Sequence, residues 1–473
     1  MNVERAVYKM PALPEYRLNP LISALPERAC DESLITYLSY YPECLEFEKT
    51  APSNIRVQFI SRLDQLRQPI PVYLQCYRAI EEAIIDSYSM RNPLSPTTNN
   101  YLHYSEKNRP QIRPRTGFFR PKASGITVIG ESGVGKTTML EQILSCFPDR
   151  IEHRNFHGHE INFGQVVWIM VNCPSDSSIR GLCHEIIEQI SLKQGTPAPK
   201  PARNLDDLIT QIGRLVKSSF LGILVIDEMQ NLNIAKAGGE KRLVSFLHNF
   251  MNAMGVPIIL CANPPFQTIL SDSLKTARRA ESKGYFKVDL LPNDEIWELF
   301  VESLWELQWT NQYTPLSPEL LSELHTLSYG NIEIAIRIFR NAQKFIIGSN
   351  DERITVDVLR YTAANSVTVS RLAMESGKKK EAESFAEKVK EAKQASKKSP
   401  PQRIESEFRR VPEDLSRAQH KEFNCDYTKY SLELLSELDI DTDVFQRATE
   451  TSSPIEDLRH LDLVCDAPLE RFK

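Results

Sequence analysis

The sequence predicts an α/β fold, in which a parallel sheet covered by helices on both faces is followed by a compact helical region. Between residues 125 and 290, short apolar runs alternate with amphipathic stretches, which is typical of buried parallel strands joined by helices. Between residues 292 and 372, apolar side chains recur at the period of a helix, as in Trp297, Phe300 and Leu304. We therefore expect an α/β core with a helical lid.

These patterns place the individual elements of the core and the lid. The strands are expected at Ile126–Ile129, Val166–Val171, Ile223–Ile226, Val256–Cys261 and Phe286–Leu290. The helices of the core are expected at Lys136–Cys146, Ile179–Lys193, Leu205–Ser219, Lys241–Met254 and Phe266–Ser271. The helices of the lid are expected at Asp294–Gln308, Pro318–Leu327, Asn331–Phe345 and Val356–Thr362.

Changes in composition divide the chain into four regions. Residues 1–115 carry short helical patterns between prolines and predict a helical docking module with a linker. The α/β core is expected over 116–291 and the lid over 292–374. Residues 375–473 predict a flexible, partner-binding tail, because the stretch 378–398 holds eight lysines and four glutamates with almost no apolar side chain.

Bulk composition excludes several classes of protein. With a net charge of −5, the chain gives no global sign of nucleic-acid binding, so any such surface must be local. Its nine cysteines lack CxxC spacing, which argues against a zinc ribbon and a disulfide scaffold and for reduced thiols in cytoplasm. No long apolar run predicts a membrane span. The cluster His153, His157 and His159 is interpreted as a solvated loop rather than a metal site.

A glycine-rich segment of the pattern GxxxxGKT follows the first strand and leads into a helix. In that context successive backbone N–H groups converge on phosphate oxygens at the helix N-terminus. Lys136 is expected to reach the β- and γ-phosphates, and the Thr137 hydroxyl to ligate Mg²⁺. The predicted cofactors are therefore ATP and Mg²⁺. The nucleotide-binding residues would be Gly130, Glu131, Ser132, Gly133, Val134, Gly135, Lys136, Thr137 and Thr138.

Polar residues at the ends of two later strands complete a hydrolytic site. The strand 223–226 leads into Asp227 and Glu228, which fit a Mg²⁺ ligand and a base that polarises the attacking water. The strand 256–261 is followed by Asn263, which is expected to help position that water or, failing that, to be a turn residue.

Arg278 and Arg279 precede the last strand of the core and are candidates for the cation that a neighbouring subunit contributes to such a site. A solvated turn is the alternative.

The chain resembles the TnsC/TniB-type AAA+ regulators of bacterial DNA transposition from about Pro110 to Gln343. The combination DE-x-Q-x-L with GGE-K is the most selective part of the resemblance. The matching segments are 130–138, 165–168, 172–174, 181–183, 227–232, 235–241, 255–257, 277–279 and 308–310.

This resemblance implies an ATPase of the AAA+ class that assembles on double-stranded DNA as a ring or helical filament. Such a protein links a target-selection protein to the transposase, and hydrolysis controls assembly and disassembly. DNA would be held along its backbone, independently of sequence. The residues that would contact it are Arg180, Lys236, Lys241 and Arg242.

Other functions fit parts of the same pattern. A small-molecule kinase is disfavoured, because Asp227 and Glu228 suit water activation whereas a kinase excludes water. Another DNA-associated ATPase of the AAA+ class, of the initiator or helicase-loader type, and a scaffold that uses ATP as a switch with little hydrolysis remain open alternatives.

Overall fold

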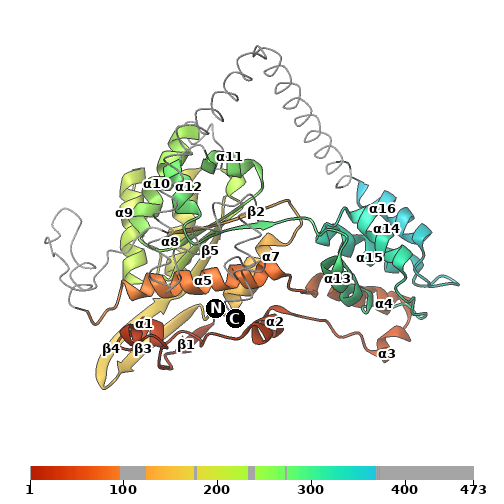
Figure 1. Cartoon of the computed structure of the whole chain (residues 1–473), viewed down its shortest axis with the longest axis horizontal. Helices are drawn as coiled ribbons and strands as arrows, with labels where there is room; N and C mark the ends of the chain where they lie inside the picture. Colours follow the sequence, from red (N-terminus) through yellow and green to blue (C-terminus); the bar gives the residue numbers. More distant parts are fainter. Residues whose placement is uncertain are drawn as a thin grey trace, which may run out of the picture. The chain divides into compact units, whose positions relative to one another are not determined.

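The computed structural model describes residues 2–95, 124–174, 178–232, 240–271 and 274–368, together with 370 and 372. These residues belong to one compact unit (Figure 1). The predicted tail over 375–473, most of the predicted linker and the DNA-contact candidate Lys236 lie outside the described residues. None of the helices described is long and apolar enough to cross a membrane.

The main sheet is parallel, which confirms the predicted fold class. In the described chain its strands are β2 (Gly125–Gly130), β5 (Trp168–Asn172), β6 (Ile223–Asp227), β7 (Ile258–Ala262) and β8 (Gly284–Val288). Their order across the sheet is β5-β6-β7-β2-β8. As a result β7 pairs with β2 on one side and with β6 on the other, so the ends of these three strands are adjacent.

One face of the sheet carries four of the predicted core helices and one, Leu274–Ala280, that was not predicted. Their side chains form a buried apolar cluster with β5, β6 and β7, from Val166 through Leu182 and Ile212 to Phe250. The helices are α8 (Ile179–Gln194), α9 (Leu205–Ser218), α10 (Glu240–Met254), α11 (Pro265–Ser271) and α12 (Leu274–Ala280).

The opposite face is covered by α7 (Lys136–Ser145) and by α5 (Pro71–Ser89), a helix of the N-terminal region (Figure 1). Apolar residues line the buried side of α5, including Tyr77, Ile80 and Ile84. At its end the Tyr88 hydroxyl donates to the carbonyl of Phe220 at 3.0 Å. The N-terminal region thus supplies a layer of the core.

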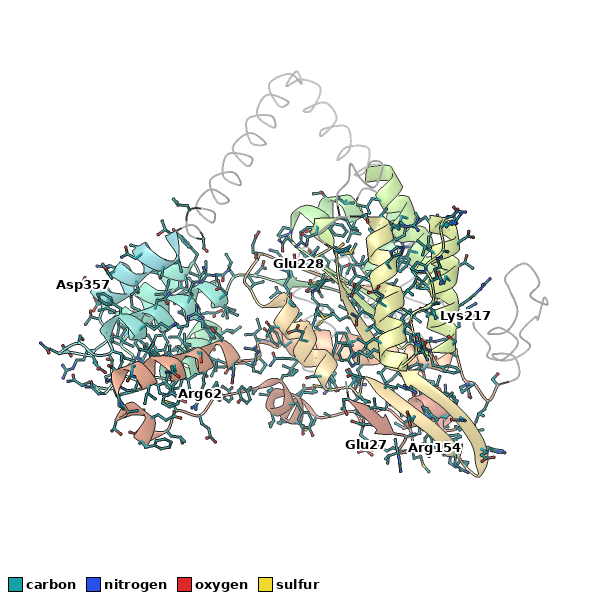
Figure 2. All side chains as sticks on the ribbon, turned by 180° about the vertical axis from the view of Figure 1, so that it is seen from behind. Glu27, Arg62, Arg154, Lys217, Glu228 and Asp357 are labelled. Atoms are coloured by element: carbon teal, nitrogen blue, oxygen red, sulfur yellow. The ribbon has the colours of Figure 1, made fainter. Side chains whose placement is uncertain are left out.

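A second sheet was missed by the sequence analysis. It consists of β1 (Val3–Arg5), β3 (Arg150–Phe156) and β4 (His159–Val166), in the order β1-β3-β4. The predicted strand Val166–Val171 is therefore divided, because β4 ends at Val166 and β5 begins at Trp168. The expected solvated histidine loop is wrong for His153, which is buried, whereas His157 and His159 are exposed near the turn of the hairpin. Arg154, labelled in Figure 2, is exposed on the same hairpin.

The lid is helical, as predicted, and each helix begins at a side-chain cap or proline. Asp294 accepts hydrogen bonds from the N–H groups of Ile296 and Trp297, and Asn331 accepts one from Ile334. The lid helices are α13 (Glu295–Trp305), α14 (Pro318–Ser328), α15 (Ile332–Ile346) and α16 (Val356–Ser366).

Short N-terminal helices precede α5. Pro20–Ser23 and Asp31–Leu38 contact α5, whereas the helices from Glu46 onward contact the lid or one another. The last of them, η2, lies against α15. They are η1 (Pro14–Tyr16), α1 (Pro20–Ser23), α2 (Asp31–Leu38), α3 (Glu46–Lys49), α4 (Ser53–Phe59) and η2 (Ile60–Gln65). Residues 2–95 therefore contact both the core and the lid, whereas the sequence analysis described a docking module.

Candidate nucleotide site

The glycine-rich segment forms a tight loop between β2 and α7. Gly133 and Gly135 have φ angles of 83° and 91°, in the left-handed region that favours glycine. A Cβ at Gly133 would lie 2.9 Å from the side-chain oxygen of Asn331, so the lid also requires a glycine there. Helix α7 begins at Lys136, directly after this turn, and its first N–H groups are available to an anion.

Lys136 lies folded over the loop. Its ammonium group donates to the carbonyls of Gly130 and Glu131 at 2.8 and 2.7 Å and to the side-chain oxygen of Asn263 at 3.0 Å. The side chain is almost fully buried. These three acceptors hold the ammonium group beside the loop. When a nucleotide binds, the group can exchange them for phosphate oxygens.

The two predicted magnesium ligands are in direct contact. The Thr137 hydroxyl donates to one carboxylate oxygen of Asp227 at 2.6 Å, and the other oxygen accepts the N–H of Glu228 at 2.7 Å. No group of three or more metal-binding side chains occurs in the described part of the chain. A hydroxyl and one carboxylate fit Mg²⁺, which completes its octahedral shell with phosphate oxygens and water.

Glu228 and Asn263 are joined by Gln230, which belongs to the DE-x-Q-x-L motif but was given no role from the sequence. The side-chain amide of Gln230 donates to the Glu228 carboxylate, and its oxygen accepts the backbone N–H of Asn263 at 3.0 Å. Glu228 itself has a φ of 56°, an unusual value for a residue other than glycine. Figure 2 labels Glu228 within the core.

A cavity of about 260 Å³ opens beside the loop. Its wall combines Gly133, Gly135 and Thr138 with N-terminal residues such as Tyr73 and with the lid helices α13 and α15. Burial raises the pKa of Tyr73 to about 12, which keeps its hydroxyl protonated. The complete lining is Asp64, Leu66, Arg67, Gln68, Tyr73, Gly133, Gly135, Thr138, Gln142, Phe300, Ile332, Glu333, Ile336, Arg337 and Arg340.

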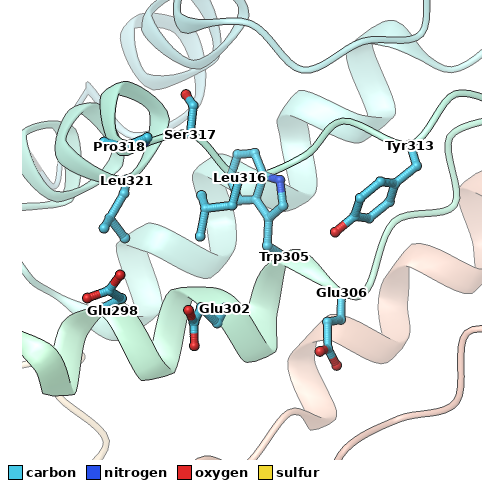
Figure 3. A pocket seen from close by; sticks show the side chains of 9 residues that line it. All are labelled: Glu298, Glu302, Trp305, Glu306, Tyr313, Leu316, Ser317, Pro318 and Leu321. Atoms are coloured by element: carbon cyan, nitrogen blue, oxygen red, sulfur yellow. The ribbon is translucent and has the colours of Figure 1, made fainter.

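A second cavity, of about 390 Å³, lies within the lid (Figure 3). Glu298, Glu302 and Trp305 line it from α13, Glu306 from the position directly after that helix, and Tyr313 from the loop that follows. Three carboxylates would repel the negative charges of a nucleoside triphosphate. The cavity beside the glycine-rich loop is therefore the better candidate for a nucleotide.

Arg278 and Arg279 lie in the last turn of α12, so the alternative of a solvated turn does not describe them. Arg278 is exposed and Arg279 is half-buried. The Thr127 hydroxyl donates to the carbonyl of Ala280 at 2.9 Å, which places the end of α12 beside the first half of β2. The glycine-rich loop follows the other end of that strand. The structure therefore does not bring the two arginines to the site of their own chain.

Of the four DNA-contact candidates, Arg180 is the one whose side chain the structure describes. The exposed Arg180 guanidinium donates to the carbonyls of Ala202 and Arg203. Lys241 and Arg242 lie in the first turn of α10, and their side chains are outside the described part of the structure.

Comparison with known proteins identifies the core. Residues 120–270 match the family model described as an AAA domain. The α/β core is an AAA domain. No curated protein matches the chain significantly.

Solved structures similar to this chain include other proteins with distant sequences. Cdc6p from Pyrobaculum aerophilum is 13% identical with a TM-score of 0.38, over 62% of this chain and 67% of that one. The ORC2 protein from Aeropyrum pernix is 14% identical with a TM-score of 0.33, over 52% of this chain and 63% of that one. A Walker-type ATPase from Pyrococcus abyssi is 14% identical with a TM-score of 0.34, over 55% and 71%. The assignment of the AAA domain rests on the family model and the sheet, and not on these similarities.

Proposed function

We propose that the AAA domain binds ATP with Mg²⁺ and hydrolyses it to ADP and phosphate. The observation that carries the proposal is the contact of Thr137 with Asp227 directly beside Glu228, at the end of the glycine-rich loop. In a P-loop ATPase these residue types hold the metal and activate water. The cavity of about 260 Å³ would take the nucleoside.

The proposed reaction assigns one step to each polar residue. Lys136 exchanges the carbonyls of Gly130 and Glu131 for the β- and γ-phosphates. Bound Mg²⁺ would neutralise charge on the same phosphate oxygens. The Glu228 carboxylate accepts a proton from the attacking water, and the Asn263 side chain orients that water once Lys136 has left it.

Replacing Glu228 by glutamine tests the hydrolytic assignment. The amide keeps the shape of the side chain but cannot accept a proton, so we expect turnover to fall by about 100-fold or more with little change in ATP affinity. Steady-state phosphate release and binding of a fluorescent ATP analogue measure the two quantities. Glu160→Gln, at an exposed position on β4, is the control. Unchanged turnover in Glu228→Gln would contradict the assignment.

We further propose, from the resemblance in sequence, that the ATPase regulates DNA transposition. It would oligomerise on double-stranded DNA with ATP bound, connect a target-selection protein to the transposase, and disassemble on hydrolysis. The motif Asp227–Leu232, which carries the resemblance, supports this proposal. So do the arginines at the far end of the sheet, because they suit a site shared between copies.

Size analysis with ATP, Mg²⁺ and duplex DNA tests this role. We expect large assemblies on two duplexes of unrelated sequence, with an affinity that falls steeply as salt rises. In Lys136→Ala, ATP should no longer promote assembly on DNA. Monomers under all conditions would contradict the proposal, and strong preference for one duplex sequence would favour an initiator-type protein instead.

A further inference from the structure

We propose that Gln230 is a positioning residue for hydrolysis, which holds the Glu228 carboxylate at a fixed position relative to Asn263. This inference rests on the proposed ATPase activity. It concerns a side chain that would touch neither the nucleotide nor the metal, and that acts only through the two groups expected to contact the attacking water.

The contacts of Gln230 run in two directions. Its amide nitrogen donates to the Glu228 carboxylate, and its amide oxygen accepts the Asn263 N–H at 3.0 Å. Asn263 in turn accepts a hydrogen bond from Lys136. One chain of contacts therefore leads from the proposed base to the lysine of the glycine-rich loop, and Gln230 is its central member.

The end of the β-ladder explains why an acceptor is needed at this point. Strands β6 and β7 remain paired as far as Ile226 and Leu260. Beyond these residues the chain of β6 turns into the short helix η3 (Met229–Asn231), so the Asn263 N–H lies past the last rung. The Gln230 oxygen takes the place of the missing strand carbonyl.

Glu228 needs this support because its backbone does not fix the carboxylate. Its φ of 56° places the residue in a sharp turn, and its side chain is only partly buried. In the described part of the chain, Gln230 donates a hydrogen bond to this carboxylate. Without it, the carboxylate can rotate away from the water position, and a misplacement of about 1 Å is enough to reduce a rate by about 100-fold.

Only a neutral amide of this length can make both contacts. A leucine offers neither donor nor acceptor. A glutamate keeps the acceptor but loses the donor and brings a second negative charge against the Glu228 carboxylate. Both substitutions should therefore lower kcat more than they change the binding of ATP.

The test compares Gln230→Leu with wild type in steady-state ATP hydrolysis and ATP-analogue binding. We expect kcat to fall by about 10- to 100-fold while KM and the dissociation constant change less than about threefold. Gln211→Leu is the matched control, because Gln211 is also half-buried and its amide also makes two hydrogen bonds, to Lys200 and Ala202, far along the chain from the loop. The control should hydrolyse ATP as wild type does.

The kcat of Gln230→Glu provides the second readout. In this variant kcat should fall at least as far as in Gln230→Leu, because the added carboxylate repels the carboxylate of Glu228 from its position. A Gln230→Glu variant with the kcat of wild type would overturn the proposal. So would a Gln230→Leu variant with unchanged or increased kcat, or one in which kcat and ATP affinity fall together.

The outcomes separate this inference from the proposed function. An active wild type with an unimpaired Gln230→Leu variant would overturn the role of Gln230 alone. A wild type that binds ATP without measurable hydrolysis would overturn the ATPase assignment, and the role of Gln230 with it.

Discussion

His153 is a buried histidine whose surroundings favour the neutral ring. The Tyr8 hydroxyl lies 2.9 Å from Nδ1, and the Gln165 side-chain oxygen lies 2.8 Å from Nε2. Gln165 also donates its amide nitrogen to the carbonyl of Leu21, so its oxygen faces the histidine. Burial lowers the pKa of His153 to about 4, although the hydrogen bond to Gln165 opposes this shift.

Acidification should therefore destabilise the protein through His153. The unfolded chain gains a proton near pH 6.5 and the folded chain only near pH 4, so stability is present above this window and is lost as pH falls through it. Between pH 7 and pH 5.5 the loss should be about 1 kcal/mol. Urea unfolding at both pH values should show a smaller pH dependence in His153→Asn. His159→Asn, at an exposed position, should keep the wild-type dependence. An unaltered dependence in His153→Asn would contradict this origin.

At the level of single residues, the sequence was most informative where one local pattern carries the chemistry. Lys136, Thr137, Asp227 and Glu228 could be selected because each follows a strand or begins a helix. Gln230 and His153 could not, because their partners Asn263 and Tyr8 are distant in sequence and no periodic pattern reports such contacts. The roles of the selected residues stay predictions until the variants are measured.

Among the elements, α4 is joined to the lid by a buried ion pair. Arg56 forms a two-pronged contact with Glu352, and both side chains are nearly inaccessible. Although burial opposes ionisation, hydrogen bonds from Arg56 and from the N–H groups of Asn311 and Gly348 hold the pKa of Glu352 at about 2. Glu352 therefore remains charged at every ordinary pH and requires its partner.

Removing the arginine should destabilise the attachment of α4. In Arg56→Met the Glu352 carboxylate stays buried without its counter-ion, which costs about 3–5 kcal/mol. Chemical denaturation measures the loss, and hydrogen exchange should show faster exchange in α4 and in residues 346–354. Arg360→Met removes a more exposed pair with Glu323 and should cost far less stability. Equal losses in the two variants would contradict the importance of burial.

Strands and helices with a strong local period were predictable, and β2, β6, α8 and α9 occur close to their expected positions. The small sheet of β1, β3 and β4 was not predicted, because β1 comes from the first residues of the chain and pairs with the distant β3. The same limit applies to α5. Its amphipathic period was recognised, but the period does not say that its buried face packs on the AAA domain.

For the whole molecule, the two ends of the sheet carry different functional groups. The glycine-rich loop follows the last residue of β2, whereas α12 with Arg278 and Arg279 ends beside its first half. The five steps of this strand span about 16 Å. An arginine side chain cannot cover that distance, so these two residues could reach a triphosphate only in a second copy of the chain.

Mixing two inactive variants tests this arrangement. Lys136→Ala should lose nucleotide binding, and the double variant Arg278→Ala with Arg279→Ala should bind ATP but hydrolyse it slowly. If each copy completes the site of its neighbour, a mixture should recover part of the wild-type turnover, because some interfaces combine an intact loop with intact arginines. Full activity of the double variant alone, or a mixture no more active than its components, would contradict a shared site.

The N-terminal region gives the lid a second attachment, which is non-covalent. The chain itself runs from β8 into α13, whereas η2 packs against α15 and is joined through residues 66–70 to α5 on the sheet. Leu66, Arg67 and Gln68 belong to this joining segment and also line the cavity of about 260 Å³. A molecule that fills the cavity would therefore touch the segment that ties the support of the lid to the sheet.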